Sequence, residues 1–368
     1  MRIELYDQMF DEKERPLCQF DAFSITTFRY ESGVAALRII NARGEIIVLP
    51  FQGQQIWRAN FDGRDLTMRS MFDEPVFTRN YLENYGAFMI HCGITGLGAP
   101  GPNDNHQLHG ELPNAPFNSA WLELDPDKRS TKVGGTYQHI VAFSTNYLAT
   151  VETAMKAESA LLDVSVSVEN LKQTPMDLMY LGHANFRPVD EGELHYSAFY
   201  NSKSVRVRQS IPSHVNPKPG YKEFLSRLAD SPEIHHILQP GLAFDPEVVF
   251  EIDMINDADG FAHALQKHPN GTADYVRCRP DQAPICTRWI CRTPDQDGLG
   301  IAFPSTSGVE GYTAEKEKGR IKTVQSGDTW RIEIKLGLLT ASETEKTIKM
   351  IAALKAVSYT HLTLPTKA

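Results

Sequence analysis

The chain has 368 residues, of which 41% are hydrophobic and 23% charged, a composition typical of globular proteins and unlike that of disordered or fibrous chains. Its 37 basic and 46 acidic residues give a formal net charge of −9, which argues against nucleic acid as a partner. No apolar run approaches the roughly 18 residues of a membrane span, and the acidic N-terminus lacks the apolar segment of a signal peptide, so we expect a cytoplasmic protein.

The five cysteines are an odd number in a long chain, and they lack the C-x₂-C pairing that structural zinc prefers. Reduced structural thiols are therefore expected, together with no metal site and no cofactor.

Alternation with a period of two dominates the chain. The segments ALRIIN and EIIVLPF flank Ala42-Arg43-Gly44, which predicts a β-hairpin with glycine in its turn. Asp62-Gly63 predicts a second tight turn. Apolar residues alternate with polar ones over 162–168 and again over 330–336, as in strands with one buried and one solvated face.

Helical patterns are few. Apolar residues at helical spacing from Tyr221 to Leu228 predict a short helix after Pro219-Gly220. Ser342 and Glu345 have the spacing of a capping box in front of an apolar stripe, which predicts a helix near the end of the chain. Many strands, 25 glycines and 22 prolines beside two or three helices predict an all-β protein, a large antiparallel β-sandwich, rather than a βαβ fold.

No internal repeat or linker divides the chain, so residues 1–356 are expected to form a single domain. The final segment, VSYTHLTLPTKA, shows neither the helical nor the strand period and resembles a translated sequencing-adapter read. Residues 357–368 are accordingly predicted to be a non-native tail.

Three loops rich in glycine or proline carry the residues best suited to chemistry, because functional side chains concentrate in loops. LHGE contains His109, LGHANF contains His183 and GVEG contains Glu310. Taken one at a time, each of these residues is more often an ordinary surface or hydrogen-bonded side chain than a catalyst.

As an ordered set, these loops resemble the aldose 1-epimerase superfamily of galactose mutarotase-like proteins, in particular its bacterial epimerase-like branch. The likeness rests on LHGELPNAPF, LGHANFRP, GVEG with EKGRI, and the strand SGDTWRIEI, and it covers nearly all of residues 20–340. The chain has LHGE where the more typical family sequence has LHGG, and the Asp and Arg that hold sugar hydroxyls in better-known members have no clear counterpart here.

The resemblance implies a large antiparallel supersandwich that binds a small sugar and interconverts its anomers without metal or nucleotide. It implies that His109, His183 and Glu310 act together. Opening a hemiacetal requires a base at the C1 hydroxyl and an acid at the ring oxygen, and the reference pKa values of Glu and His, about 4.3 and about 6.5, suit that pair. We therefore expect Glu310 to be the base and His183 the acid, with His109 orienting the ring oxygen or a neighbouring hydroxyl.

Four further residues are candidates for binding the sugar. Asn185 and Arg187 lie beside His183 and either bind hydroxyls or an acidic substituent, or belong to the scaffold. Glu247 precedes a predicted strand and is a candidate hydroxyl ligand. Trp289 fits either a stacking platform for a sugar or a place in the core.

Two other functions remain open at this stage. The same sandwich can serve as a non-catalytic sugar-binding or sensor module, because a fold does not guarantee a reaction. A glycoside hydrolase or lyase would need a second carboxylate near Glu310, for which Glu247 and Glu111 are the candidates. In each case the expected partner is a small sugar, with no nucleic acid and no membrane, and the protein is expected to be a monomer or homodimer.

Overall fold

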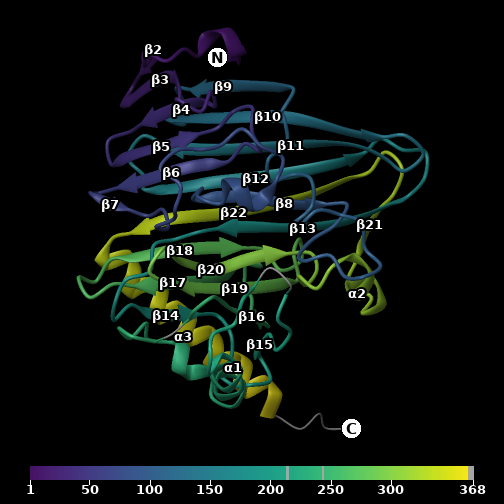
Figure 1. The fold of residues 1–368 in the computed structure, drawn as a ribbon. Helices are drawn as coiled ribbons and strands as arrows, with labels where there is room; N and C mark the ends of the chain where they lie inside the picture. The colour runs from purple at the N-terminus through teal and green to yellow at the C-terminus, as the bar shows by residue number, and fades with distance from the viewer. Residues whose placement is uncertain (213–214, 243, 364–368) are drawn as a thin grey trace.

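The computed structural model describes residues 1–212, 215–242 and 244–363, with side chains as far as residue 356. Its core is formed by two large antiparallel sheets, as predicted (Figure 1). The strands are β1 (Arg2–Leu5), β2 (Arg15–Phe20), β3 (Phe23–Arg29), β4 (Ala35–Ile40), β5 (Gly44–Val48), β6 (Ile56–Phe61), β7 (Arg64–Asp65), β8 (Met89–Ile94), β9 (Ser119–Asp125), β10 (Ser130–Val141), β11 (Thr145–Lys156), β12 (Leu161–Asn170), β13 (Met176–Ala184), β14 (Glu193–Tyr196), β15 (Val205–Val207), β16 (Val248–Ile252), β17 (Ala262–Lys267), β18 (Ala273–Cys278), β19 (Ile285–Arg292), β20 (Asp297–Ser305), β21 (Lys322–Val324) and β22 (Thr329–Leu339). The helices are α1 (Tyr221–Asp230), α2 (Tyr312–Glu317) and α3 (Ala341–Thr363), with short 3-10 helices η1 (Asp7–Met9), η2 (Tyr81–Asn84) and η3 (Pro232–His235).

One sheet has nine strands in the order β1-β9-β10-β11-β12-β22-β18-β17-β14. The other has thirteen, in the order β15-β16-β19-β20-β13-β8-β6-β5-β4-β3-β2, with β21 paired to β13 and β7 to β6. Side chains from the facing sides of the two sheets form one hydrophobic core, to which β3 contributes Ile25 and β9 contributes Leu122. Strands that follow one another in the chain are mostly neighbours in a sheet, as in other antiparallel folds.

The two strands predicted from alternation are confirmed. In β12, Leu162, Val164, Val166 and Val168 are all buried, and the polar residues between them point outward. β22 pairs with β12 along its length, and its apolar residues are buried in the same way.

The predicted hairpin and the Asp-Gly turn are confirmed, but Gly44 begins β5, so the turn of the hairpin is formed by Ala42 and Arg43. β4 and β5 pair across the first turn, where the Asn41 side chain accepts hydrogen bonds from the backbone N–H groups of Arg43 and Gly44, each at 2.9 Å. Asp62 and Gly63 join β6 to β7 with φ values of 52° and 76°. Positive φ at both central positions is the geometry of a two-residue hairpin, and it explains the Asp-Gly pair.

The helix predicted after Pro219-Gly220 is α1, but the capping box predicted for the C-terminal helix was wrong in its position. Thr340 donates its backbone N–H to the Glu343 carboxylate at 2.8 Å, and the Glu343 N–H donates to the Thr340 hydroxyl at 3.3 Å. Both this pair and the predicted Ser342–Glu345 pair have the required spacing. Because β22 runs to Leu339, the helix begins directly after Thr340 and uses the earlier pair.

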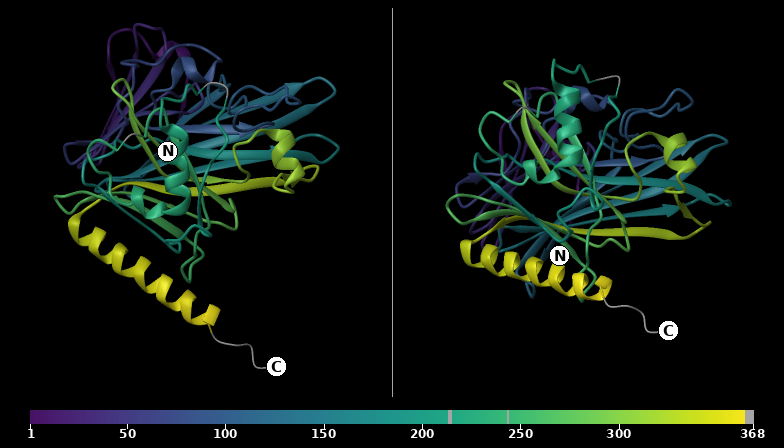
Figure 2. Two further views of the ribbon diagram at one scale, coloured as in Figure 1. Left: turned by 60° about the horizontal axis from the view of Figure 1, so that its bottom comes forward. Right: turned by 90° about the horizontal axis from the view of Figure 1, so that it is seen from below.

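Helix α3 lies along the outer face of the nine-stranded sheet, where Ile351 packs with Leu265 and Tyr275 (Figure 2). The helix continues to Thr363 and so includes the first part of the predicted tail. Residues 364–368 of that tail lie outside the described residues, and its origin stays a prediction. In the described part of the chain, no helix is both long and apolar enough to cross a membrane.

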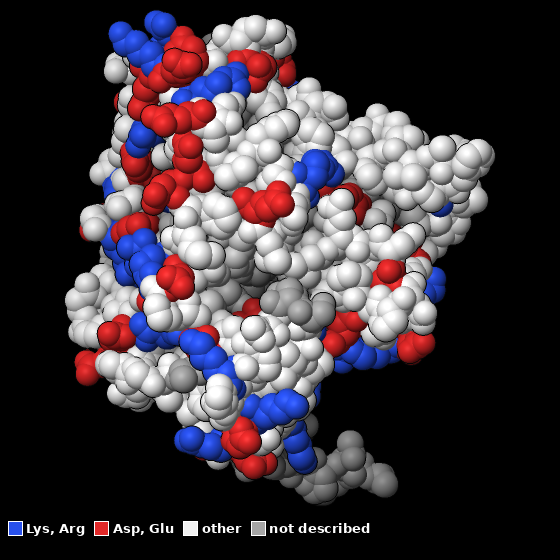
Figure 3. All heavy atoms as spheres, in the orientation of Figure 1, with Lys and Arg blue, Asp and Glu red and all other residues white. Residues whose placement is uncertain are grey.

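Acidic and basic side chains lie next to one another along one edge of the face drawn in Figure 3, and the hollowed centre of that face carries few charges.

Candidate functional site

A cavity of about 280 Å³ lies on the thirteen-stranded sheet, near the lower end of the size range of ligand pockets. Alternate residues of the strands line it, including Leu181 of β13, Val249 of β16, and Thr287 and Trp289 of β19. Because side chains of a strand alternate between the two faces of its sheet, the residues between these lining residues point toward the other sheet. The strands therefore fix the base of the cavity, and loops build its sides.

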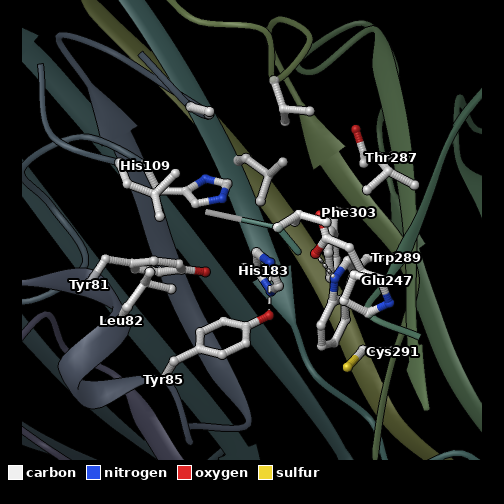
Figure 4. A pocket seen from close by; sticks show the side chains of 18 of the residues that line it. Tyr81, Leu82, Tyr85, His109, His183, Glu247, Thr287, Trp289, Cys291 and Phe303 are labelled. Carbon is white, nitrogen blue, oxygen red and sulfur yellow. Dashed lines mark hydrogen bonds between the residues drawn. The ribbon is translucent and has the colours of Figure 1, made fainter. Parts of the chain in front are cut away.

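His183 lies near the end of β13 at the centre of this cavity and is only 4% exposed (Figure 4). Its ring packs against Phe303, with the ring centroids 4.0 Å apart, and the Tyr85 hydroxyl lies 3.4 Å from its Nε2 atom. Burial lowers the pKa of His183 to about 3, although the hydrogen bond with Asn185 partly opposes that shift. At neutral pH this imidazole is therefore uncharged.

The hydrogen bonds of Asn185 determine which nitrogen of His183 carries the proton. The Asn185 amide donates its Nδ2 group to the Ala87 carbonyl at 3.0 Å, which turns Oδ1 toward His183 Nδ1 at 2.7 Å. An amide oxygen only accepts hydrogen bonds, so Nδ1 must be the protonated nitrogen. The lone pair is then on Nε2, on the cavity side, where it accepts a hydrogen bond from the Tyr85 hydroxyl at 3.4 Å.

His109 forms part of the wall beside Tyr81, with the two ring centroids 4.7 Å apart. Its ring is perpendicular to that of His183, at a centroid distance of 5.8 Å. The backbone there is tightly held, because His109 donates to the Gly98 carbonyl and accepts from the Gly93 N–H. At the next position φ is 78°, and a Cβ on Gly110 would lie 2.4 Å from the Gly93 oxygen, so only glycine fits there.

Glu247 and Trp289 form the opposite wall (Figure 4). The indole N–H of Trp289 donates to Glu247 Oε2 at 2.7 Å and fixes the carboxylate at the cavity surface. Among the described residues that line the cavity, Glu247 is the sole carboxylate. The arrangement brings together His109, His183, Glu247 and Trp289, four of the seven residues predicted from the sequence.

Glu310 is not among the described residues of this cavity. It lines an adjoining hollow of about 390 Å³, where its carboxylate lies 2.5 Å from Arg208 Nε and accepts hydrogen bonds from the Ser210 hydroxyl. Its chain neighbour Val309 does line the cavity. Arg208, the partner of Glu310, borders both spaces, as do Val249, Thr287 and Val309.

Asn185 and Arg187 are also absent from the described lining of the cavity. Asn185 is buried behind His183, and Arg187 forms an ion pair with Asp65 at 2.7 Å and donates to the Thr67 carbonyl. These two residues contact other parts of the protein, so they support the site and do not line the cavity.

Several cavity residues were not predicted from the sequence: Tyr81, Tyr85, Arg208, Thr287 and Phe303. Tyr81 begins η2 and Tyr85 follows its last residue, and their ring centroids lie 5.1 Å apart. Burial raises the pKa of both phenols well above the usual value, so they stay protonated donors. Thr287 shares a strand face with Trp289, a signal that was available once the strand was recognised.

The fold matches solved structures of galactose mutarotase-like proteins. A provisionally assigned aldose 1-epimerase from Klebsiella pneumoniae superposes with a TM-score of 0.77 at 20% identity, over 96% of this chain and 91% of that one. A galactose mutarotase-like protein from Clostridium acetobutylicum gives 0.59 at 15% identity, over 86% of this chain and 98% of that one. One from Lactobacillus casei gives 0.53 at 13% identity, over 82% and 99%. At these identities the likeness concerns the fold.

No protein with a curated description matches the chain. A family model described as "Domain of unknown function (DUF4432)" matches residues 31–338. Since that match spans most of the sequence, the chain belongs to the DUF4432 family, and its fold is the galactose mutarotase-like β-sandwich predicted from the sequence.

Proposed function

We propose that this protein interconverts the anomers of a free sugar by general acid–base catalysis in the cavity around His183. The observation that carries the proposal is the convergence of two imidazoles and one carboxylate on a small cavity whose other walls are mostly apolar and include four aromatic side chains. Aromatic faces pack against the C–H groups of a sugar ring, and the polar groups reach its oxygens.

The chemistry needs two protons to move at two points of one small ring. The C1 hydroxyl loses a proton as the ring oxygen gains one, the open aldehyde rotates about its C1–C2 bond, and the ring closes on the other face. General acid and base groups at these two oxygens contribute roughly 10²- to 10⁴-fold. His183 and His109 stand at a right angle on adjoining walls and are suited to these two positions. Glu247 is suited to accept hydrogen bonds from hydroxyl groups on the far side.

A glycosidase is less well supported, because hydrolysis normally uses two carboxyl groups on either side of the scissile bond. Of the two candidate partners of Glu310, Glu247 lies in the cavity that Glu310 does not line. The other, Glu111, is occupied by the Thr95 hydroxyl and the Tyr147 hydroxyl, each at 2.8 Å. Among the described residues, no two carboxylates line the cavity.

Two matched variants test which carboxylate serves the cavity. Glu247→Gln is expected to lower kcat/KM for anomer exchange about 10- to 100-fold, since a hydrogen bond to a charged group contributes about 1.5–3 kcal/mol. Glu310→Gln is expected to lower it less than about tenfold, because this carboxylate is paired with Arg208 at a partly exposed position. Saturation-transfer NMR on the sugar that the wild type exchanges fastest measures both values.

A larger loss of kcat/KM in Glu310→Gln than in Glu247→Gln would instead identify Glu310 as the carboxylate that acts on the sugar, as the family resemblance implies. Binding of sugars without any acceleration of exchange would instead support a non-catalytic binding protein.

A further inference from the structure

The hydrogen bonds behind His183 point to a further role for a neighbouring side chain, and this inference rests on the proposed function. We propose that Asn185 is a positioning residue that holds His183 as its Nδ1–H tautomer, so that Nε2 is the base that takes the proton from the C1 hydroxyl. The sequence resemblance implies the reverse polarity, with His183 as the acid.

Asn185 is fixed in one orientation. It is fully buried, its backbone N–H donates to the Phe88 carbonyl at 2.7 Å, and its own carbonyl accepts from the Met68 N–H at 3.0 Å. Flipping the side-chain amide would place Oδ1 against the Ala87 carbonyl oxygen, two acceptors facing each other. The amide therefore presents its oxygen to His183 Nδ1, and only the Nδ1–H form of the imidazole satisfies that contact.

The surroundings of His183 also disfavour an imidazolium. The titratable or charged groups that share the cavity with it are the phenols of Tyr81 and Tyr85, the imidazole of His109, the Glu247 carboxylate, the Arg208 guanidinium and the Cys291 thiol. Its remaining ring neighbours are Trp289 and Phe303, which carry no charge. No ion pair joins a carboxylate to His183 among the described residues, and the lowering of its pKa to about 3 by burial agrees with this geometry.

The resulting step is balanced. The C1 hydroxyl proton passes to His183 Nε2, the C1–oxygen bond of that hydroxyl becomes a carbonyl, and the bond from C1 to the ring oxygen breaks. Its electron pair stays on the ring oxygen, which takes a proton from the cationic form of His109. Ring closure reverses both transfers, so each imidazole recovers its starting state. During the open-chain stage the charge on His183 is shared with Asn185 Oδ1 through Nδ1–H.

The variant Asn185→Asp separates the two polarities, because it places a carboxylate on Nδ1 and raises the pKa of the imidazole, by roughly one to three units for an adjacent opposite charge. If Nε2 is the base, the acidic limb of the kcat/KM profile moves up from about pH 3 by the same roughly one to three units, and activity at pH 5 relative to pH 8 falls below the wild-type ratio by up to about tenfold. The control Asn185→Leu lacks any acceptor and is expected to lower the rate at every pH and to move that limb, if at all, to lower pH, because the hydrogen bond that raises the pKa of His183 is lost. Extension of activity toward alkaline pH in Asn185→Asp would overturn the proposal, since a protonated His183 would then be the active form.

A second measurement reads the tautomer in the wild type itself and needs no known substrate. In the ¹⁵N-histidine-labelled wild type at pH 7, the NMR signals of His183, assigned by their loss in His183→Ala, should show a protonated Nδ1 and a bare Nε2. An Nε2–H tautomer or an imidazolium there would overturn the proposal. This result is independent of whether any sugar is turned over, so failure of this inference and failure of the proposed function are distinguishable.

Discussion

Replacing His183 by alanine is expected to lower kcat for anomer exchange by at least about 100-fold, the lower end of the usual contribution of a general acid or base. The imidazole lies at the centre of the cavity, and the variant has no group there that can exchange a proton with the sugar. Polarimetry at saturating sugar, with NMR line shapes to confirm folding, measures the effect.

His91 provides a matched control for this variant. It is equally buried, it stands on β8 beside β13, and burial lowers its pKa to about 3 as well. Its ring faces the sandwich core, where Nδ1 lies 2.8 Å from the Tyr180 hydroxyl, and not the cavity. His91→Leu keeps a side chain of similar volume and is expected to change kcat by less than about threefold. Equal losses in the two variants would attribute the effect of His183→Ala to general damage to the fold.

The largest effect on stability is expected from Asp274→Ala. Asp274 is fully buried in β18, and its carboxylate accepts two hydrogen bonds from Arg64, at 2.8 and 2.6 Å, and one from Gln266 at 2.7 Å. Removing one partner of a buried ion pair costs about 3–5 kcal/mol, and the lower value is expected because Arg64 is 19% exposed and can be hydrated. Urea unfolding at pH 7, compared at equal m values, measures the loss.

The pH dependence of this contribution has a defined sign. Burial alone raises the pKa of Asp274, but the Arg64 guanidinium outweighs that effect and holds the pKa below its usual value. A carboxyl whose pKa is lower in the folded state contributes fully above its unfolded value of about 3.9 and loses the contribution as pH falls through the folded pKa. The difference between wild type and Asp274→Ala should therefore shrink below about pH 4.

Asp163→Ala is the control for exposure. Asp163 pairs with Lys335 across β12 and β22, but its side chain is 47% exposed, so its loss should cost less than about 1 kcal/mol. If the two alanine variants were equally stable, burial of the Arg64–Asp274 pair would have no part in holding the sheets together.

The sheets could be predicted from the sequence because their signal is local. In β12 and β22 the alternation of apolar and polar residues indicates which face of the strand is buried, and an Asp-Gly pair favours a two-residue turn. The capping box illustrates the limit of such signals. Two pairs near Thr340 have the same spacing, and only the end of β22 at Leu339 decides between them.

The cavity could be predicted only in part, because its composition depends on which side of the chain each residue faces. Glu310 was selected by its place in an ordered set of motifs. Val309 lines both the cavity and the adjoining hollow, whereas Glu310 lines only the hollow, where Arg208 pairs with its carboxylate. Glu247 was predicted as a ligand, yet its pairing with Trp289 joins residues 42 positions apart, a contact that no local pattern encodes.

The most direct test of the proposed function is an exchange measurement on the purified protein across neutral, deoxy, acidic and sulfonated aldoses. Saturation-transfer NMR should show faster anomer interconversion than the buffer alone for at least one of these sugars, and His183→Ala should abolish the acceleration. No acceleration for any sugar of the panel, or an acceleration that His183→Ala leaves intact, would contradict anomer interconversion in this cavity.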